Sequence, residues 1–173
     1  GFKTGALPQH ALWFHCASVG EVITILPLIK EIYRRHPDKK IIITTTTITG
    51  AKIVAQQQFN QLAHAYLPFD FPYAIKRFLH KVEPQQLLVV ETEIWPNLFY
   101  YCHKNNCPIS IINARLSIKT TAANDWIKNR LRTALQYPDY IYTRSQIDAT
   151  AYLALGADKD KIKIIGKIKR FLK

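Results

Sequence analysis

Three short runs of polar residues each follow an apolar segment and could carry out chemistry. The first is Ser18-Val19-Gly20-Glu21, where Gly20 permits a close approach of the backbone and Glu21 falls in the first turn of a predicted helix. A helix N-terminus favours a carboxylate, so we expect Glu21 to stay ionised and to be able to accept a proton from an attacking hydroxyl. The same position also suits a carboxylate that only complements the helix dipole, and the spacing leaves both interpretations open.

The second run is Glu91-Thr92-Glu93-Ile94-Trp95-Pro96, directly after an apolar segment. Two acids at the end of a buried strand are costly unless they face a cleft or find partners. Trp95 could pack against a ligand or anchor the core beside a helix start. Both a functional and a structural interpretation therefore remain open for this run.

The third run is Asn113-Ala114-Arg115-Leu116-Ser117. Arg115 offers a planar fork that suits a phosphate or a carboxylate, although an ion pair with Glu91 or Glu93 would use it equally well. No Gly-rich dinucleotide fingerprint, P-loop or G-x-S-x-G sequence is present, which argues against an oxidoreductase, an NTPase and a serine hydrolase of those types. Cys102, His103 and Cys107 lack a second ligand cluster, so a zinc site is not predicted.

The elements that must position these runs alternate between strand and helix. Apolar and β-branched runs predict strands, and apolar residues at helical spacing predict helices. This pattern predicts one doubly wound α/β domain over 1–173, with a mostly parallel sheet and helices on both faces. Ligands of such sheets bind at the carboxyl ends of the strands, where all three runs fall. Strands are expected over 12–17, 41–47, 63–67, 87–90, 109–112, 140–143 and 162–165, with helices over 21–36, 49–59, 96–105, 122–135 and 145–155 and another from Pro72.

Composition limits the class of protein and its partners. The 173 residues carry a net charge of +12, which favours an anionic partner such as nucleic acid, an anionic lipid surface or a phosphorylated substrate. No apolar run is long enough to cross a bilayer and no signal peptide is recognisable. The three cysteines fit a reducing, cytoplasmic setting, with Cys16 packed as a small hydrophobe. Because no methionine begins the chain, we expect native residues upstream of Gly1.

Five ordered blocks of the sequence together resemble the Kdo transferase family, glycosyltransferases of the lipopolysaccharide pathway. The resemblance extends over essentially the whole chain, and five blocks in order are far more specific than any one of them. The blocks are His15-Cys16-Ala17-Ser18-Val19-Gly20-Glu21, Thr45-Thr46-Thr47-Ile48-Thr49-Gly50, Leu67-Pro68-Phe69-Asp70, Glu91-Thr92-Glu93-Ile94-Trp95-Pro96-Asn97 and Asn113-Ala114-Arg115-Leu116-Ser117.

The resemblance implies the acceptor-side half of a two-domain GT-B glycosyltransferase that transfers 3-deoxy-D-manno-octulosonic acid (Kdo) from CMP-Kdo to the lipid A precursor. By similarity Glu21 is the general base, and Glu91 and Lys169 stabilise the transition state. Ser18, Gly20, Glu93 and Arg115 are the expected substrate-binding residues. The family's closing block, roughly Gly-Asn-x-Lys-Phe-Asp, stands here as Gly166-Lys167-Ile168-Lys169-Arg170-Phe171, so Lys167 and Arg170 depart from the pattern.

The resemblance further implies that the CMP-sugar domain and the family's amino-terminal membrane anchor are absent from this chain. We therefore expect the fragment to be inactive alone and the whole enzyme to act at the cytoplasmic face of the bacterial inner membrane. No metal or other cofactor is needed in this account. Core packing is expected for Phe69, Phe71 and Tyr73, with contact to acyl chains as the alternative. The candidate contacts to anionic lipid are Lys30, Arg34, Arg35, Lys39, Lys40, Lys128, Arg130 and Arg132.

Two rival functions remain at this point. One is a GT-B transferase for another acidic sugar or acceptor, which would share the fold. The other is a non-catalytic module that binds an anionic surface or nucleic acid, although no RRM, KH or helix-turn-helix signature is present and we expect no nucleic-acid partner.

Overall fold

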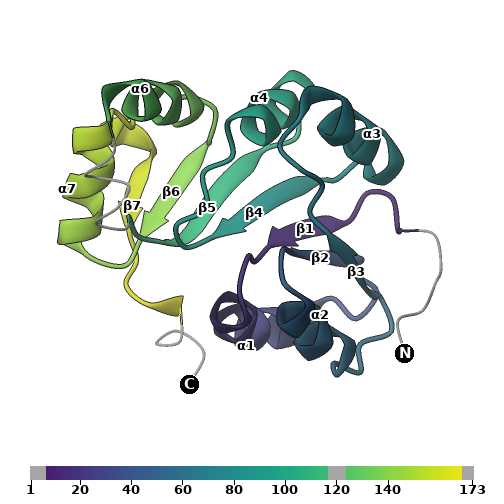
Figure 1. Cartoon of the computed structure of the whole chain (residues 1–173). Coiled ribbons are helices and arrows are strands. Elements are labelled where there is room, and N and C mark those ends of the chain that lie inside the picture. The colour runs from purple at the N-terminus through teal and green to yellow at the C-terminus, as the bar shows by residue number, and fades with distance from the viewer. Residues whose placement is uncertain (1–6, 117–123, 169–173) are drawn as a thin grey trace.

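Seven parallel strands form a single sheet in the computed structural model, which describes residues 7–116 and 124–168. The strand order is β3-β2-β1-β4-β5-β6-β7, so the order reverses between β1 and β4 (Figure 1). This is the doubly wound arrangement that the sequence predicts. The strands are β1 (Leu12–His15), β2 (Ile41–Thr45), β3 (Leu62–Tyr66), β4 (Gln86–Val90), β5 (Ile109–Ala114), β6 (Tyr140–Thr143) and β7 (Ile162–Ile164).

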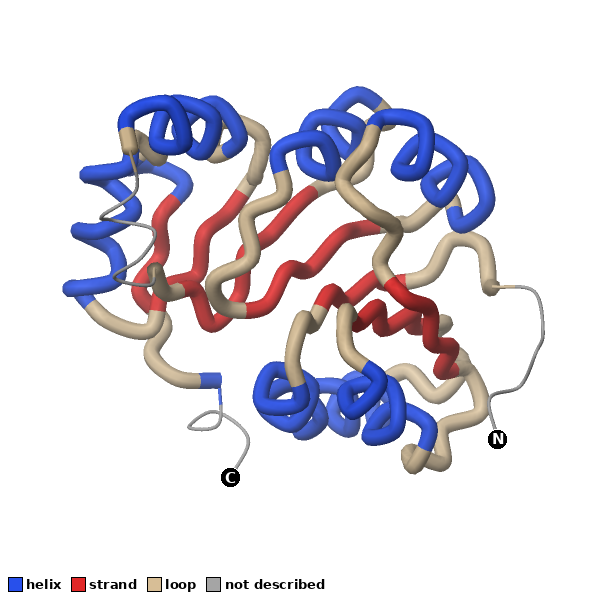
Figure 2. The backbone as a smooth tube through the Cα atoms, viewed as in Figure 1, coloured by secondary structure: helices blue, strands red, loops and turns tan. Residues whose placement is uncertain are grey.

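Helices cover both faces of this sheet (Figure 2). The helices α1 and α2 lie on one face, and α3, α4 and α6 lie on the other. Among the described residues, no helix is both long and apolar enough to cross a bilayer. The helices are α1 (Val19–Arg35), α2 (Ile48–Ala55), α3 (Pro72–Val82), α4 (Pro96–Lys104), α6 (Asp125–Ala134) and α7 (Gln146–Leu155), with a 3-10 turn η1 (Lys159–Lys161) before β7.

Local sequence signals account for most helix ends. Ser18, Thr47 and Ser145 each accept a hydrogen bond from a backbone N–H in the first turn of the helix that they precede. Pro72 and Pro96 occupy first-turn positions, where a missing N–H costs nothing. Gly156 ends α7 with φ 100°, a conformation that only glycine adopts without strain.

Two separate hydrophobic cores result from the two layers. Strand residues alternate between them: Trp13 and Ile42 pack under α3 and α4, whereas Phe14 and Ile43 pack against α1 and α2. The strands β1, β2, β4 and β5 are buried on both faces, which explains their nearly continuous apolar sequence.

Three expectations from the sequence are wrong. Phe69, Phe71 and Tyr73 do not pack into the core but are 81%, 66% and 75% exposed, because the β3–α3 loop lies on the surface. The helix expected over 122–135 has an apolar stripe that includes Trp126 and predicts its burial, but only the last turn of α6 packs inward. Trp126 is exposed, with the Arg130 guanidinium over its ring. The helix expected over 49–59 ends at Ala55, because Phe59 packs away from the helix against Tyr33.

Candidate active site at the reversal of strand order

The three polar runs meet at the carboxyl ends of β1, β4 and β5, which are neighbouring strands. The strand order reverses between β1 and β4, and ligands of doubly wound sheets bind at such a point. The sequence placed each run at a strand end, and the strand order brings the ends together. The chemistry of the site can therefore be built from Glu21, Glu91, Glu93 and Arg115.

Glu21 closes a capping box at the start of α1. The Ser18 hydroxyl donates to Oε1 of Glu21 at 3.0 Å, and Ser18 Oγ accepts from the Glu21 backbone N–H at 3.3 Å. The Ala17 N–H donates to Oε2 at 2.7 Å. These bonds fix the carboxylate at the mouth of the helix, so Ser18 positions the predicted base rather than only lying beside it.

The helix N-terminus does not keep Glu21 strongly acidic. The pKa of the Glu21 carboxyl is raised to about 7, mainly by burial and to a smaller extent by the nearby charges of Glu93 and Glu91, against the hydrogen bonds from Ala17 and Ser18 that lower it. Only 7% of the residue is exposed. Desolvation therefore outweighs the helix dipole, which by itself would hold this group ionised well below neutral pH. A pKa near neutrality suits a group that must take up and release a proton.

Glu91 is fixed by two partners from the next strand. Its Oε2 lies 3.0 Å from Nε of Arg115, and its Oε1 accepts from Nδ2 of Asn113 at 3.2 Å. Of the two acids considered as partners for Arg115, the one that pairs with it is Glu91. The Tyr152 hydroxyl of α7 lies 3.4 and 3.5 Å from the backbone carbonyls of Glu91 and Arg115, so α7 packs close to both strand ends.

The backbone is strained at this point of the sheet. Glu91 has φ 63° and Asn113 has φ 52°, both in the left-handed region that residues other than glycine rarely adopt. Such conformations persist where the surrounding structure imposes them, and they cluster at functional sites. Oδ1 of the buried Asn113 has no hydrogen-bond partner among the described residues. Asn113 therefore belongs to the candidate site, although the sequence did not single it out individually.

Glu93 lies on the β1 side of the site. Its Oε2 accepts from the Trp95 indole N–H at 2.9 Å, and Nε2 of the buried His15 is 3.9 Å from the same oxygen. Trp95 thus orients Glu93 while packing partly against the core. Its ring also makes an edge contact with His15, with centroids 5.9 Å apart.

Packing against the described residues does not require glycine at position 20. A Cβ at this position would meet only Ser18 Oγ at 3.8 Å, an ordinary contact. Gly50, in contrast, is confined by Thr47 and Thr45, whose side chains would lie 3.0 and 3.3 Å from an added Cβ, so the close fit at the start of α2 explains the glycine of this block. The space at Gly20 lies in the first turn of α1, one residue before Glu21.

A hydrogen-bonded helix cap joins two of the sequence blocks, which lie far apart along the chain. Pro96 opens α4 without a side-chain cap from Trp95, and Asp70 of the β3–α3 loop supplies it. Asp70 accepts from the backbone N–H groups of Asn97 and Leu98 at 3.1 and 2.8 Å, and its carbonyl accepts from the Asn97 side chain at 2.6 Å. This cap fixes the start of α4 directly after the Glu91–Trp95 segment.

Two predicted residues lie outside the described part of the chain. These are Lys169, expected near the leaving phosphate, and Ser117 at the end of the third run. Within the ranges 7–116 and 124–168, no group of three or more His, Cys, Asp or Glu residues is placed to hold a metal ion.

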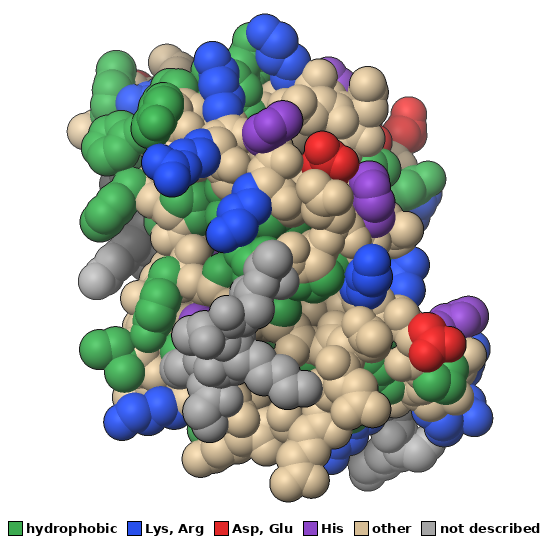
Figure 3. Space-filling view, turned by 90° about the vertical axis from the view of Figure 1, so that its right-hand side faces the viewer, with side chains coloured by type: hydrophobic (Ala, Val, Ile, Leu, Met, Phe, Trp, Pro, Cys, Tyr) green, Lys and Arg blue, Asp and Glu red, His purple; other side chains and the backbone are tan. Residues whose placement is uncertain are grey.

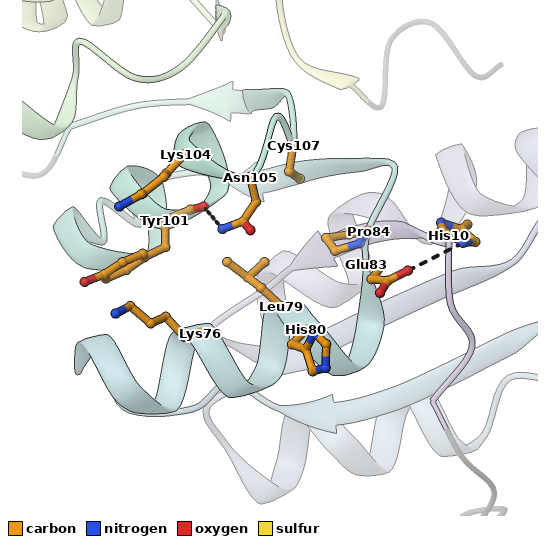
Figure 4. Close-up of a pocket in the computed structure, with 10 residues that line it drawn as sticks. All are labelled: His10, Lys76, Leu79, His80, Glu83, Pro84, Tyr101, Lys104, Asn105 and Cys107. Carbon is orange, nitrogen blue, oxygen red and sulfur yellow. Dashed lines mark hydrogen bonds and ion pairs between the residues drawn. The ribbon is translucent and has the colours of Figure 1, made fainter.

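A cavity of about 600 Å³ lies elsewhere in the molecule, between α3 and α4 (Figure 4). It opens at the amino-terminal edge of the sheet, because His10, Pro84 and Cys107 precede β1, β4 and β5. An ion pair of 3.7 Å joins His10 to Glu83 on its rim. None of the predicted site residues that the structure describes lines this cavity, so it is separate from the candidate active site.

Comparison with known proteins agrees with the resemblance in the five blocks. Residues 1–172 match the family described as 3-deoxy-D-manno-octulosonic-acid transferase (kdotransferase). The chain is 38% identical to the 3-deoxy-D-manno-octulosonic acid transferase of Haemophilus influenzae over 94% of its own length and 38% of that protein. It is 32% identical to a bifunctional glycosyltransferase/methyltransferase of Fusobacterium nucleatum, over 93% of this chain and 25% of the relative. The chain therefore spans about a quarter to two-fifths of these relatives.

Solved structures show the same fold at low sequence identity. The UDP-GlcNAc 2-epimerase of Neisseria meningitidis superposes with a TM-score of 0.63 at 13% identity, over 91% of this chain and 47% of the epimerase. The corresponding enzyme of Rickettsia bellii gives 0.62 at 13% identity, over 95% and 46%. These likenesses support the Rossmann-like, GT-B type of fold. On its sequence match over nearly the full length, this chain belongs to the 3-deoxy-D-manno-octulosonic acid transferase family.

Proposed function

We propose that this chain is the acceptor-side domain of a transferase that moves Kdo from CMP-Kdo to the lipid A precursor. The observation that carries the proposal is the position of Glu21. It is a buried carboxyl with a pKa of about 7, bonded to Ala17 and Ser18 at the reversal of strand order, in a member of the Kdo transferase family. In the full-length protein a second domain is proposed to hold the CMP-sugar against this edge of the sheet.

The proposed reaction is an attack of an acceptor hydroxyl on the sugar carbon that carries the phosphate. Glu21 takes the hydroxyl proton as the new carbon–oxygen bond forms, and the bond to the CMP phosphate breaks with its electron pair on the phosphate. Positive character develops on the sugar and negative charge on the leaving group. Glu91, which Arg115 and Asn113 contact, is proposed to stabilise the former, and Lys169 is proposed to stabilise the latter.

The test of this function is a transfer assay with the full-length protein. Incubation with CMP-Kdo and a phosphorylated, acylated glucosamine disaccharide is expected to give a product heavier by one or more Kdo residues, detected by mass spectrometry. Transfer from another CMP-activated acidic sugar but not from CMP-Kdo would support the rival transferase. Vesicle binding without transfer from either donor would favour the non-catalytic module.

We further propose that the domain acts at the cytoplasmic face of the inner membrane, with the β3–α3 loop as its lipid-facing segment. Phe69 and Phe71 are exposed at the carboxyl edge of the sheet, on the loop that Asp70 anchors to α4. Figure 3 shows hydrophobic side chains along one margin of the molecule, with Lys and Arg side chains among them. Exposed aromatic rings on a domain with a net charge of +12 suit an interface of apolar chains and anionic headgroups.

Some of the basic residues chosen from the sequence are less suitable for this contact. Arg34 and Arg35 both pair with Glu31, at 2.7 and 2.6 Å, at the carboxyl end of α1. Lys39 donates to the Gln85 side chain at 2.6 Å. These residues lie toward the amino-terminal edge of the sheet, away from the β3–α3 loop. The membrane proposal therefore relies on the β3–α3 loop more than on Arg34, Arg35 and Lys39.

Sedimentation with vesicles tests the membrane proposal. The 173-residue chain is expected to bind phosphatidylcholine vesicles that contain phosphatidylglycerol, and to bind them less as salt rises. The double variant Phe69→Ser, Phe71→Ser should bind at least about tenfold more weakly, because two apolar side chains no longer enter the interface. Ile147→Ser, an equally exposed position on α7, is the matched control and should bind like the unaltered protein. Equal weakening by both variants would contradict the assignment of the loop.

A further inference from the structure

A series of polar contacts connects the interior of the sheet with the candidate active site. The Trp13 indole N–H donates to Oγ1 of Thr44 at 2.8 Å, and the same oxygen lies 3.0 Å from Nδ1 of His15. On the other side of the ring, Nε2 of His15 faces Oε2 of Glu93 at 3.9 Å. Trp13, Thr44 and His15 are all fully buried, so these contacts are shielded from water.

The hydrogen positions in this series of contacts follow from which of its groups can donate a hydrogen bond. An indole nitrogen can only donate, so the Thr44 oxygen must accept from Trp13. Thr44 then has one O–H left, and its two possible acceptors are Nδ1 of His15 at 3.0 Å and the Phe14 carbonyl at 3.5 Å. Because O–H···O bonds normally measure 2.5–3.0 Å, the longer contact is a poor one, and the hydroxyl hydrogen belongs on Nδ1. An Nδ1 that accepts a hydrogen bond leaves the ring hydrogen on Nε2.

The other end of the ring leads to the same tautomer. Nε2 has no hydrogen-bond partner among the described residues, and the group that it faces is a carboxylate. A bare nitrogen lone pair pointing at Oε2 of Glu93 would be repelled, whereas an N–H would be attracted. At 3.9 Å this contact is longer than a hydrogen bond, so it acts on the direction of the carboxylate through electrostatics. The Trp95 N–H, at 2.9 Å from the same oxygen, is the short bond that completes the arrangement.

We propose that His15 is a positioning residue, fixed as the neutral Nε2–H tautomer by Trp13 and Thr44, which aims the Glu93 carboxylate into the transfer site. This inference rests on the proposed function for its effect on turnover, but not for the tautomer itself. Glu93 is one of the charges that act on Glu21, so the direction of its carboxylate bears on the base. His15 touches no reacting atom in this arrangement and acts only through Glu93.

Two variants separate the two ends of the imidazole. In asparagine the amide nitrogen and oxygen are one bond from Cγ, like Nδ1, whereas in glutamine they are two bonds from Cγ, like Nε2. His15→Asn can thus still accept from Thr44 but presents nothing to Glu93. His15→Gln can still present an N–H to Glu93 but loses the contact with Thr44. His10→Gln, at the opposite edge of the sheet, is the control.

The first measurement is made on full-length protein labelled with ¹⁵N in histidine, at about pH 8, where an ordinary histidine is neutral. The His15 signals, identified by their loss in His15→Gln, are expected to show a protonated Nε2 and an unprotonated Nδ1. A hydrogen on Nδ1, or a doubly protonated ring, would overturn the proposal. This readout needs no transfer activity, so it stands whether or not the proposed function does.

The second measurement compares turnover with stability. His15→Asn is expected to lower kcat by about tenfold or more with little change in KM, because a contact to a charged group is lost, while His15→Gln stays within about threefold of the unaltered protein. His15→Gln should nonetheless be no more stable than His15→Asn, since it gives up the buried contact with Thr44. Turnover that simply follows stability across the two variants would reduce His15 to a structural residue and overturn the proposal.

Discussion

Replacing Glu21 with glutamine in the full-length protein is expected to lower transfer by about 100- to 10,000-fold, the range that a general base contributes. Glutamine retains the capping role, because its oxygen can accept from Ala17 and its amide can donate to a rotated Ser18 hydroxyl. The fold should therefore persist while the proton acceptor is lost. For the unaltered protein, kcat/KM should fall on the acidic side with an apparent pKa near 7, since only the ionised carboxyl accepts a proton.

The same substitution is expected to stabilise the domain at and above neutral pH. The pKa of Glu21 is raised in the folded state, so below its ordinary value of 4.5 the group is neutral in both states and has no effect. As pH rises from there to about 7, the unfolded chain ionises first and the folded domain loses up to about 3 kcal/mol of stability. Glu21→Gln removes this loss, and denaturant unfolding at pH 5 and pH 8 measures it.

Glu31→Gln, on the exposed side of the same helix, is the control for both measurements. Its carboxylate pairs only with Arg34 and Arg35 in the described structure, so turnover should stay within about threefold of the unaltered enzyme. Transfer by Glu21→Gln at a similar level would refute the assignment of the base. An unchanged pH dependence of stability would show that Glu21 is not the buried acid described above.

Loss of the Glu91 side chain is expected to reduce turnover about 100-fold whether the new residue is alanine or glycine. The two variants differ in the backbone, because residue 91 has φ 63°. Alanine keeps the left-handed strain while glycine relieves it, so Glu91→Gly should be more stable than Glu91→Ala by about 1 kcal/mol. Both variants leave Arg115 and Asn113 without their partner, so this cost cancels in the comparison.

This pair separates a catalytic role of Glu91 from a structural one. If Glu91 acts on the reaction, the two variants lose turnover equally although their free energies of unfolding differ. If Glu91 only holds β4 and β5 together, turnover recovers with stability in the glycine variant. Turnover close to that of the unaltered protein in both variants would make Glu91 a structural acid without a part in transfer.

The order of strands and helices could be predicted from local patterns. β-branched runs such as 41–45 are strands buried on both faces, and the serines and threonines before α1, α2 and α7 accept the first-turn hydrogen bonds typical of N-caps. These signals depend on neighbours within a few residues. Element ends were less accurate where a distant contact decides them, as at Ala55, beyond which Phe59 stacks on Tyr33.

The composition of the site was also largely visible in the sequence, since Glu21, Glu91, Glu93 and Arg115 follow strand ends. The contacts of these residues could not be decided from the sequence, which left both Glu91 and Glu93 open as partners of Arg115. Asn113 and His15 were part of the recognised blocks, but their roles depend on contacts across neighbouring strands. Asp70 capping α4 joins residues 27 positions apart, and no local pattern identifies that bond. The exposure of Phe69 and Phe71 likewise depends on where the loop lies, not on the residue types.

By itself, the sequence determined a doubly wound α/β domain of the Kdo transferase family, with its acids at the carboxyl ends of the strands. Only the tertiary structure decided that the pKa of Glu21 lies near neutrality, that Arg115 pairs with Glu91, and that His15 faces Glu93. The physical reason is that a pKa, an ion pair or a tautomer depends on burial and on charges brought close by the strand order. Residue types and spacing within one segment do not contain that information.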